Sequence, residues 1–173
     1  MKVAEERGMH MVRSMSKEEF MHLYCLCAET VKEAFEKYEA AIIRAGGKEK
    51  MSAFFERVLS ENKDAAYADF YYPVLPEEQK QIFCFGLDSR QLAVLGKMET
   101  DKGHIYYRLD GEIMKFLLEV TVREWLFSTF YFAHKKVTIW GNYKMEFPIF
   151  CEDKAILDHY TELAKECGLE CHK

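Results

Sequence analysis

The sequence predicts an α+β protein with an N-terminal helical hairpin, a curved antiparallel β-meander and a C-terminal helix packed on the sheet. Apolar residues recur every three to four positions over 16–45, which is the spacing of one helix face. Over 113–132 they fall mostly at alternate positions, as in a strand with one buried face, and over 152–167 the helical spacing returns. Helices, then a meander, then a helix is an order typical of α+β folds.

The length and composition indicate one packed domain. The chain has 173 residues, of which 49% are hydrophobic and 31% are charged, as in an ordinary globular protein. Residues 1–15 contain four methionines and charges of both signs without a clear period. We therefore predict a flexible leader at 1–15 and a single α+β domain at 16–173.

The first predicted helix spans 16–45. Ser16 and Glu19 are spaced as a capping box, and Gly46 with Gly47 ends the segment. Between them runs one apolar stripe, formed by Phe20, Leu23, Tyr24, Cys27, Val31, Phe35, Tyr38 and Ile42. Such a helix would be ~45 Å long, whereas a compact domain of this size is roughly 40 Å across. Because part of the stripe would need a partner, we predict a homodimer through helix 16–45.

The next three segments are predicted from their apolar spacing and from their prolines. A helix over 48–62 completes the hairpin, and the aromatic residues of 64–76 form an ordered loop. Pro76 followed by two glutamates suits the first turn of a short helix. The segment 88–98 fits either a helix or a strand, and we favour a strand at 92–98. Another strand is predicted at 105–109, after a turn at Asp101-Lys102-Gly103.

The rest of the meander begins after a turn at Asp110-Gly111. The alternating run 113–132 is predicted as strand, with its regular part at 114–122 and a bend or bulge near Glu124, since twenty residues exceed the usual strand length. A hairpin of strands 137–140 and 143–147 turns at Gly141-Asn142. The last helix, 152–167, packs on this sheet.

Glu124 and Ser128 are the candidate catalytic residues. Continued alternation places both on the apolar face of the run, where core packing does not explain a carboxylate or a hydroxyl. A carboxylate in an apolar cavity has a raised pKa and can act as a general acid or base. In the competing interpretation, the strand breaks at Arg123, the register reverses and Glu124 faces solvent.

Trp125, Trp140 and Tyr143 are the candidate ligand-binding residues, because aromatic side chains with one polar atom often line small-molecule sites. The same three residues would also suit a hydrophobic core. The chain has no G-x-S-x-G, P-loop or G-x-G-x-x-G sequence.

Neither a metal site nor a cofactor is predicted. Glu18, His22, Cys25 and Glu29 share one face of helix 16–45, but that face lies opposite the apolar stripe and lacks a ligand from a second element. A solvated helix face explains these residues without a metal ion.

Charge and cysteine usage limit the classes of partner. The net charge is −5 and no lysine or arginine stripe is present, which disfavours nucleic-acid binding. No run of eighteen apolar residues is present, so no membrane span is expected. Six cysteines without a C-x-x-C motif suit reduced thiols. We therefore predict a cytoplasmic location.

The absence of a catalytic motif favours a non-catalytic cytoplasmic binding or regulatory protein, with a small-molecule or protein ligand. The alternative is a small-molecule enzyme, hydrolase-like or isomerase-like, that uses Glu124 in a sheet cavity. A deep apolar pocket around Glu124 would favour the enzyme, and a filled sheet face would favour the binding protein.

Overall fold

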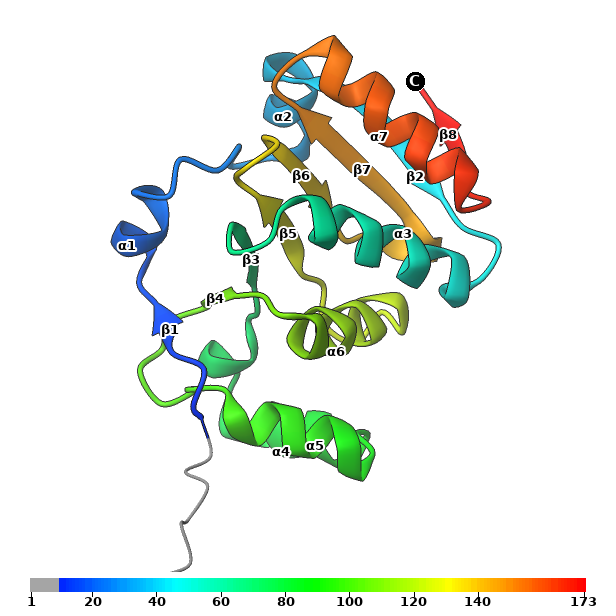
Figure 1. Cartoon of the computed structure of the whole chain (residues 1–173). Coiled ribbons are helices and arrows are strands. Elements are labelled where there is room, and N and C mark those ends of the chain that lie inside the picture. Colours follow the sequence, from blue (N-terminus) through cyan, green and yellow to red (C-terminus); the bar gives the residue numbers. More distant parts are fainter. Residues whose placement is uncertain (1–9) are drawn as a thin grey trace, which may run out of the picture.

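The computed structural model describes residues 10–173, and it shows an α+β fold with a curved, open antiparallel sheet (Figure 1). The helices are α1 (Lys17–Met21), α2 (Val31–Lys37), α3 (Lys48–Glu61), α4 (Glu77–Phe85), α5 (Ser89–Lys97), α6 (Gly111–Val122) and α7 (Lys154–Glu166), with short 3-10 turns η1 (Tyr72–Val74) and η2 (Tyr143–Met145). The strands are β1 (Ser14–Met15), β2 (Glu39–Arg44), β3 (Ala66–Asp69), β4 (Tyr106–Arg108), β5 (Thr129–Phe132), β6 (Val137–Trp140), β7 (Glu146–Cys151) and β8 (Glu170–His172).

The eight strands form one sheet in the order β1-β4-β3-β5-β6-β7-β2-β8. Each neighbouring pair is antiparallel. The longest ladder joins β2 to β7, from Glu39 opposite Cys151 to Arg44 opposite Glu146. Among residues 10–173, every helix is too short or too polar to cross a lipid bilayer.

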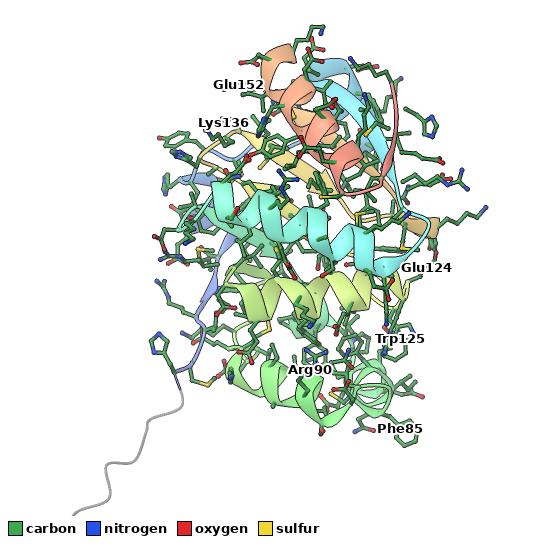
Figure 2. The ribbon with its side chains drawn as sticks, turned by 45° about the vertical axis from the view of Figure 1, so that its right-hand side comes forward. Phe85, Arg90, Glu124, Trp125, Lys136 and Glu152 are labelled. Carbon is green, nitrogen blue, oxygen red and sulfur yellow. The ribbon has the colours of Figure 1, made fainter. Side chains whose placement is uncertain are left out.

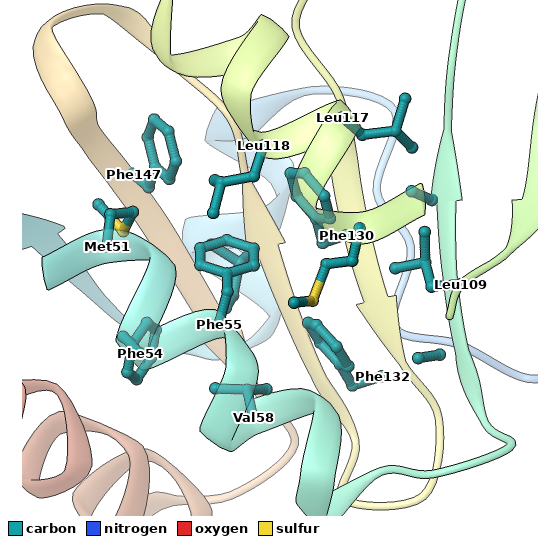
Figure 3. Close-up of a cluster of buried hydrophobic side chains, with 14 of the residues drawn as sticks. Met51, Phe54, Phe55, Val58, Leu109, Leu117, Leu118, Phe130, Phe132 and Phe147 are labelled. Atoms are coloured by element: carbon teal, nitrogen blue, oxygen red, sulfur yellow. The ribbon is translucent and has the colours of Figure 1, made fainter. Parts of the chain in front are cut away.

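The hydrophobic core lies between one face of the sheet and helices α3, α6 and α7. Figure 3 shows side chains of α3 and α6 directed at β5 and β7. The fully buried Phe55 of α3 packs edge-on against Phe130 of β5, with ring centroids 4.8 Å apart, and also contacts Phe147 of β7. Asn62, just after α3, is also fully buried. Its side chain donates to Val58 O and Tyr160 Oη and accepts from the backbone N–H of Lys135.

The N-terminal segment, which runs from α1 to α2, covers part of the opposite sheet face. Phe20 of α1 stacks on Tyr106 of β4, with ring centroids 4.0 Å apart and the planes nearly parallel. The hydroxyl of Thr138 in β6 donates to the carbonyl of Leu26 over 2.8 Å. Figure 1 shows this segment along the side of the sheet that lies away from α3 and α6. The sheet is therefore enclosed between helices on one face and this segment on part of the other.

Several predicted elements are confirmed. The helices predicted at 48–62 and 152–167 are α3 and α7, and the short helix predicted from Pro76 is α4. The strands predicted at 105–109 and 137–140 are β4 and β6. Ser16 and Glu19 form the predicted capping box.

The predicted helix 16–45 is wrong, because the segment contains α1, α2 and strand β2. Thr30 begins α2 by accepting a hydrogen bond from the N–H of Glu33. The β-branched Ile42 and Ile43 then lie in β2, between β7 and β8. No helix in this part of the described chain is longer than the domain, so helix length no longer supports a homodimer.

The predicted strand 114–122 is also wrong, because these residues form α6. Asp110 caps this helix by accepting from the N–H of Ile113, so Asp110-Gly111 begins a helix instead of a hairpin turn. Leu117 interrupts the period-2 pattern, and the helix is buried on several sides between α3, α5 and the sheet. A helix with apolar residues on most sides imitates a buried strand in sequence. The run returns to a strand only at β5.

Two further boundaries differ from the predictions. The predicted strand 92–98 is helix α5, which begins with a capping box between Asp88 and Gln91. The predicted strand 143–147 begins at Glu146, because Lys144 and Met145 have φ values of 57° and 53°, incompatible with a strand. Residues 1–9 of the predicted leader lie outside the described residues, whereas Val12 pairs with Met98 and 14–15 form β1.

Candidate functional site

A cavity of about 560 Å³ lies between the sheet and the N-terminal segment. Its wall is formed by Lys17, Phe20, Met21, Cys27, Ala28, Glu29, Glu33, Asp69, Tyr71, Tyr106, Phe127, Ser128, Thr129, Tyr131 and Trp140. We call this space the Asp69 pocket. Strands β3 to β6 supply one wall and the segment from α1 to α2 supplies the other, so residues far apart in sequence meet here. A cavity of this size is in the range that accepts a small molecule.

Asp69 is the one buried carboxylate among residues 10–173, with 5% of its surface exposed. Its position follows from alternation in β3, where Ala66 and Ala68 belong to the core. Oδ1 accepts from the backbone N–H of Thr129 over 2.7 Å, and Oδ2 accepts from the hydroxyl of Tyr131 over 3.2 Å. A carboxylate has about four acceptor positions, so these two hydrogen bonds leave capacity for a ligand.

The electrostatic state of Asp69 is set mainly by burial. Desolvation raises its pKa from 3.8 to about 6, and the hydrogen bonds from Thr129 and Tyr131 oppose that rise. Within residues 10–173, Asp69 takes part in none of the ion pairs. A buried carboxylate without a cation costs folding free energy, and such groups concentrate at functional sites.

Ser128 also lines the Asp69 pocket, and its hydroxyl has no hydrogen-bond partner within the described residues. The side chain is 1% exposed. Its backbone is fixed, since the N–H donates to Thr121 Oγ1 of α6 and the carbonyl accepts from Gly141 N–H. An unpaired buried hydroxyl is uncommon. Here the oxygen itself is closed to solvent, so the residue lines the pocket without its hydroxyl being open to it.

Aromatic rings form much of the remaining wall. They come from Phe20, Tyr71, Tyr106, Phe127, Tyr131 and Trp140. Burial raises the pKa of Tyr106 to about 12 and raises that of Tyr131 further, so both phenols are neutral at physiological pH. The wall therefore combines flat apolar faces with hydroxyl groups that can donate and accept hydrogen bonds.

The cysteine near this pocket is not an activated nucleophile. Burial raises the pKa of Cys27, which lines the pocket, and raises that of the neighbouring Cys25 to about 12. A reactive cysteine needs a lowered pKa, so both thiols remain protonated and unreactive at neutral pH. Among residues 10–173, no three side chains of His, Cys, Asp or Glu are grouped to hold a metal ion.

The predicted site residues fall into two groups. Ser128 and Trp140 line the Asp69 pocket. Glu124 does not, since it is exposed, has φ of 60° after the end of α6 and accepts from the N–H of Lys144 over 2.7 Å. The prediction that Glu124 lies in an apolar cavity is therefore wrong. The helix ends at Val122, so strand alternation does not extend to this position.

Trp125 and Tyr143 lie outside the Asp69 pocket. Trp125 lines a different hollow of about 440 Å³ beside α4, and its ring lies below the guanidinium of Arg123. Figure 2 shows Trp125 and Phe85 at the α4 end of the molecule, with Glu124 close by. Tyr143 is exposed and packs edge-on against Phe127, with ring centroids 4.7 Å apart.

Two other hollows of similar size are lined by exposed or partly exposed charges, some of which form ion pairs. The larger, of about 690 Å³, is lined by Glu99, which binds Lys102 and the Ser14 hydroxyl. The other, of about 510 Å³, contains Arg90 and Glu119, which form an ion pair at 2.7 Å. Only the Asp69 pocket, among the hollows described here, holds a buried carboxylate that forms no ion pair.

Comparison of the chain with protein-family models, with curated proteins and with solved structures gave no match in any of the three.

Sequence reasoning missed Asp69, although a signal was present. The segment 66–71 alternates two alanines and a phenylalanine with Tyr67, Asp69 and Tyr71. This is the pattern of a strand with one core face and one aromatic face, but 64–76 was predicted as a loop. An aspartate between two tyrosines on the non-core face marks the wall of a pocket once a second layer covers that face.

Proposed function

We propose that this protein binds a small organic molecule in the Asp69 pocket. The observation that carries the proposal is the Asp69 carboxylate, buried without a cation at the wall of an open cavity. A group placed in this way lowers the stability of the free protein. A bound ligand that pairs with the carboxylate would recover that free energy.

A binding role agrees with the chemistry of the neighbouring groups. The Ser128 hydroxyl has no partner within the described chain, so it is not hydrogen-bonded to a general base that would activate it as a nucleophile. The thiol of Cys27 is held in its protonated form by burial. Neither group is therefore an activated nucleophile, which favours binding over covalent chemistry.

A second candidate is a small-molecule enzyme in which Asp69, in place of Glu124, is the acid or base. The rise of the Asp69 pKa to about 6 favours this candidate, because a carboxyl that titrates near neutral pH can both accept and release a proton. Proton transfer within one substrate, as in an isomerase, needs only such a group. A serine-hydrolase mechanism fits less well, since Ser128 lacks a base.

A cytoplasmic location forms part of the proposal. All six cysteines are free thiols, and two of them, Cys25 and Cys27, are close neighbours that are not joined. Free thiols of this number suit a reducing compartment.

The experiment is a thermal-shift screen of the wild-type protein against a metabolite library, repeated with Asp69→Asn. Ligands of the proposed site should raise the melting temperature of the wild type but not that of Asp69→Asn. Glu124→Gln is the matched control, because it removes an exposed carboxylate outside the pocket and should respond as the wild type does. Stabilising compounds that act equally on Asp69→Asn would contradict the proposal.

A further inference from the structure

We propose that the ligand of the Asp69 pocket is a protonated primary amine carried on a flat or apolar body, an inference that rests on the function proposed above. The ammonium group would donate to the Asp69 carboxylate, and the body would lie against the aromatic wall.

The charge of the wall favours a cation. Three carboxylates line the Asp69 pocket, those of Asp69, Glu29 and Glu33, against one described lysine, Lys17. The Glu33 carboxylate accepts from the N–H of Glu29 over 2.9 Å. Lys17 is exposed. Among residues 10–173, no ion pair joins it to Asp69. The field in the pocket is therefore negative, which attracts cations and repels carboxylates and phosphates.

The hydrogen-bonding capacity of the wall favours a donor with several N–H groups. Asp69 accepts from the Thr129 N–H and the Tyr131 hydroxyl, and the Thr129 side chain also bonds it. A carboxylate has about four acceptor positions, so room for a further donor remains. A primary ammonium carries three N–H donors and no acceptor, which suits a carboxylate that faces a cavity.

The aromatic rings favour an organic cation over a simple metal ion. Tyr71, Tyr106 and Trp140 lie in the wall with Asp69. Ring faces attract an ammonium group and also cover the carbon skeleton that carries it. A hydrated metal ion would instead require several oxygen ligands, and the described residues contain no group of three side chains suited to one.

The test uses matched triplets of small compounds, each a primary amine, the corresponding alcohol and the corresponding carboxylate on one phenylalkyl, indolylalkyl or cyclohexylalkyl skeleton. Binding to the full chain at pH 7.5 is measured by calorimetric titration. In at least one triplet the amine should bind ten-fold or more tightly than its alcohol, and the carboxylate should bind most weakly. Asp69→Asn should remove the preference for the amine.

Two control variants separate the role of the pocket from effects on folding. Glu124→Gln should bind the amine as the wild type does, because Glu124 lies outside the pocket. Trp125→Leu, which changes the hollow beside α4, should also leave binding unchanged. The circular dichroism spectrum and melting temperature of each variant show that it is folded before binding is compared.

The outcomes distinguish this inference from the function on which it rests. If an alcohol or carboxylate binds as tightly as its amine and depends on Asp69, the ligand class is wrong and the binding site stands. If an amine binds equally to the wild type and to Asp69→Asn, both are wrong. If no amine of any triplet binds the wild type, the inference is likewise overturned, and the metabolite screen decides the proposed function.

Discussion

The phenolic hydroxyl of Tyr131 donates a hydrogen bond to Oδ2 of Asp69 over 3.2 Å, from one strand of the sheet to its neighbour. Both side chains belong to the sheet face that the N-terminal segment covers, and both are buried. Burial raises the pKa of both groups, so the bond joins a neutral phenol to a carboxyl that titrates near neutral pH. The pair is thus a polar centre within an aromatic wall.

Asp69 should make the stability of the protein depend on pH. Its pKa is about 6 in the folded chain and close to 3.8 when exposed, so the carboxyl stays protonated to a higher pH in the folded state. Protonated Asp69 favours the folded state, and this contribution is fully present below pH 3.8. It is lost as the pH rises through 6, and the total loss in the free energy of unfolding is about 3 kcal/mol. As the pH rises from 4 to 7, the wild type should therefore lose free energy of unfolding relative to Asp69→Asn, measured with urea for both proteins.

Glu99 also makes the stability depend on pH, so the effect of Asp69 is measured as the difference between the wild type and Asp69→Asn. Hydrogen bonds from Lys102 and Ser14 lower the pKa of Glu99 to about 2, which acts on stability in the opposite direction. Glu124→Gln is the control for loss of a carboxylate in general. Equal pH dependence in the wild type and Asp69→Asn would show that Asp69 is not buried as described.

Ser128 and Asn62 are both buried polar residues, yet their replacement should have different results. The Ser128 hydroxyl is unpaired within the described chain, so Ser128→Ala should change the free energy of unfolding by less than about 0.5 kcal/mol or increase it. Asn62→Ala removes hydrogen bonds to Val58, Tyr160 and Lys135, leaves buried groups unpaired and should cost about 3 kcal/mol. Urea denaturation of the two variants measures this contrast, and a larger loss in Ser128→Ala would contradict it.

Gly141 holds β6 close to the residues that position Ser128. A Cβ at this position would lie 2.5 Å from the Ser128 carbonyl oxygen and 2.6 Å from Thr121 Cγ2. Gly141→Ala should therefore lower the melting temperature by several degrees, because the backbone at Gly141 or Ser128 must shift to make room for the methyl group. Gly96→Ala is the matched control. Its Cβ would meet nothing within 4 Å in helix α5, so it should stabilise the protein by up to about 1 kcal/mol.

Phe55 and Phe85 provide a matched test of where the core lies. Phe55 is 0% exposed and packs against Phe130, so Phe55→Ala should cost about 3–5 kcal/mol through the cavity that it leaves. Phe85 is 95% exposed at the end of α4, so Phe85→Ala should change stability by less than about 0.5 kcal/mol. Similar losses in the two variants, measured by urea denaturation, would be inconsistent with this core.

Local signals in the sequence were sufficient for some elements. Helices α3 and α7 each bury one face, and a strong cap or a glycine adjoins each, so period and boundary agree. Strand β6 was predicted because β-branched residues and a glycine turn coincide. These elements depend on interactions between residues close in the chain, and such interactions can be predicted from a single sequence.

The burial of α6 was decided by the tertiary structure. Its apolar residues satisfy the strand period nearly as well as the helix period, and only the fit between α3, α5 and the sheet selects the helix. The same ambiguity allowed 16–45 to be predicted as one helix, although β2 pairs with β7 and β8 at its end. The pairing of β2 with strands that are distant in the sequence leaves no recognisable pattern in the residues of β2 themselves.

In the candidate site, too, some residues could be predicted from the sequence and others only from the tertiary structure. Ser128 was found from sequence because alternation placed a hydroxyl on the apolar face of the predicted run 113–132, and Trp140 was chosen as one of three aromatic candidates. Asp69 was missed, because an aspartate among tyrosines becomes unusual only when burial removes its water. That burial comes from the segment between α1 and α2, forty residues earlier in the chain, which crosses the sheet face. Sequence reasoning therefore identified two residues of the pocket wall, and tertiary packing decided which residues join them and that the carboxylate is desolvated.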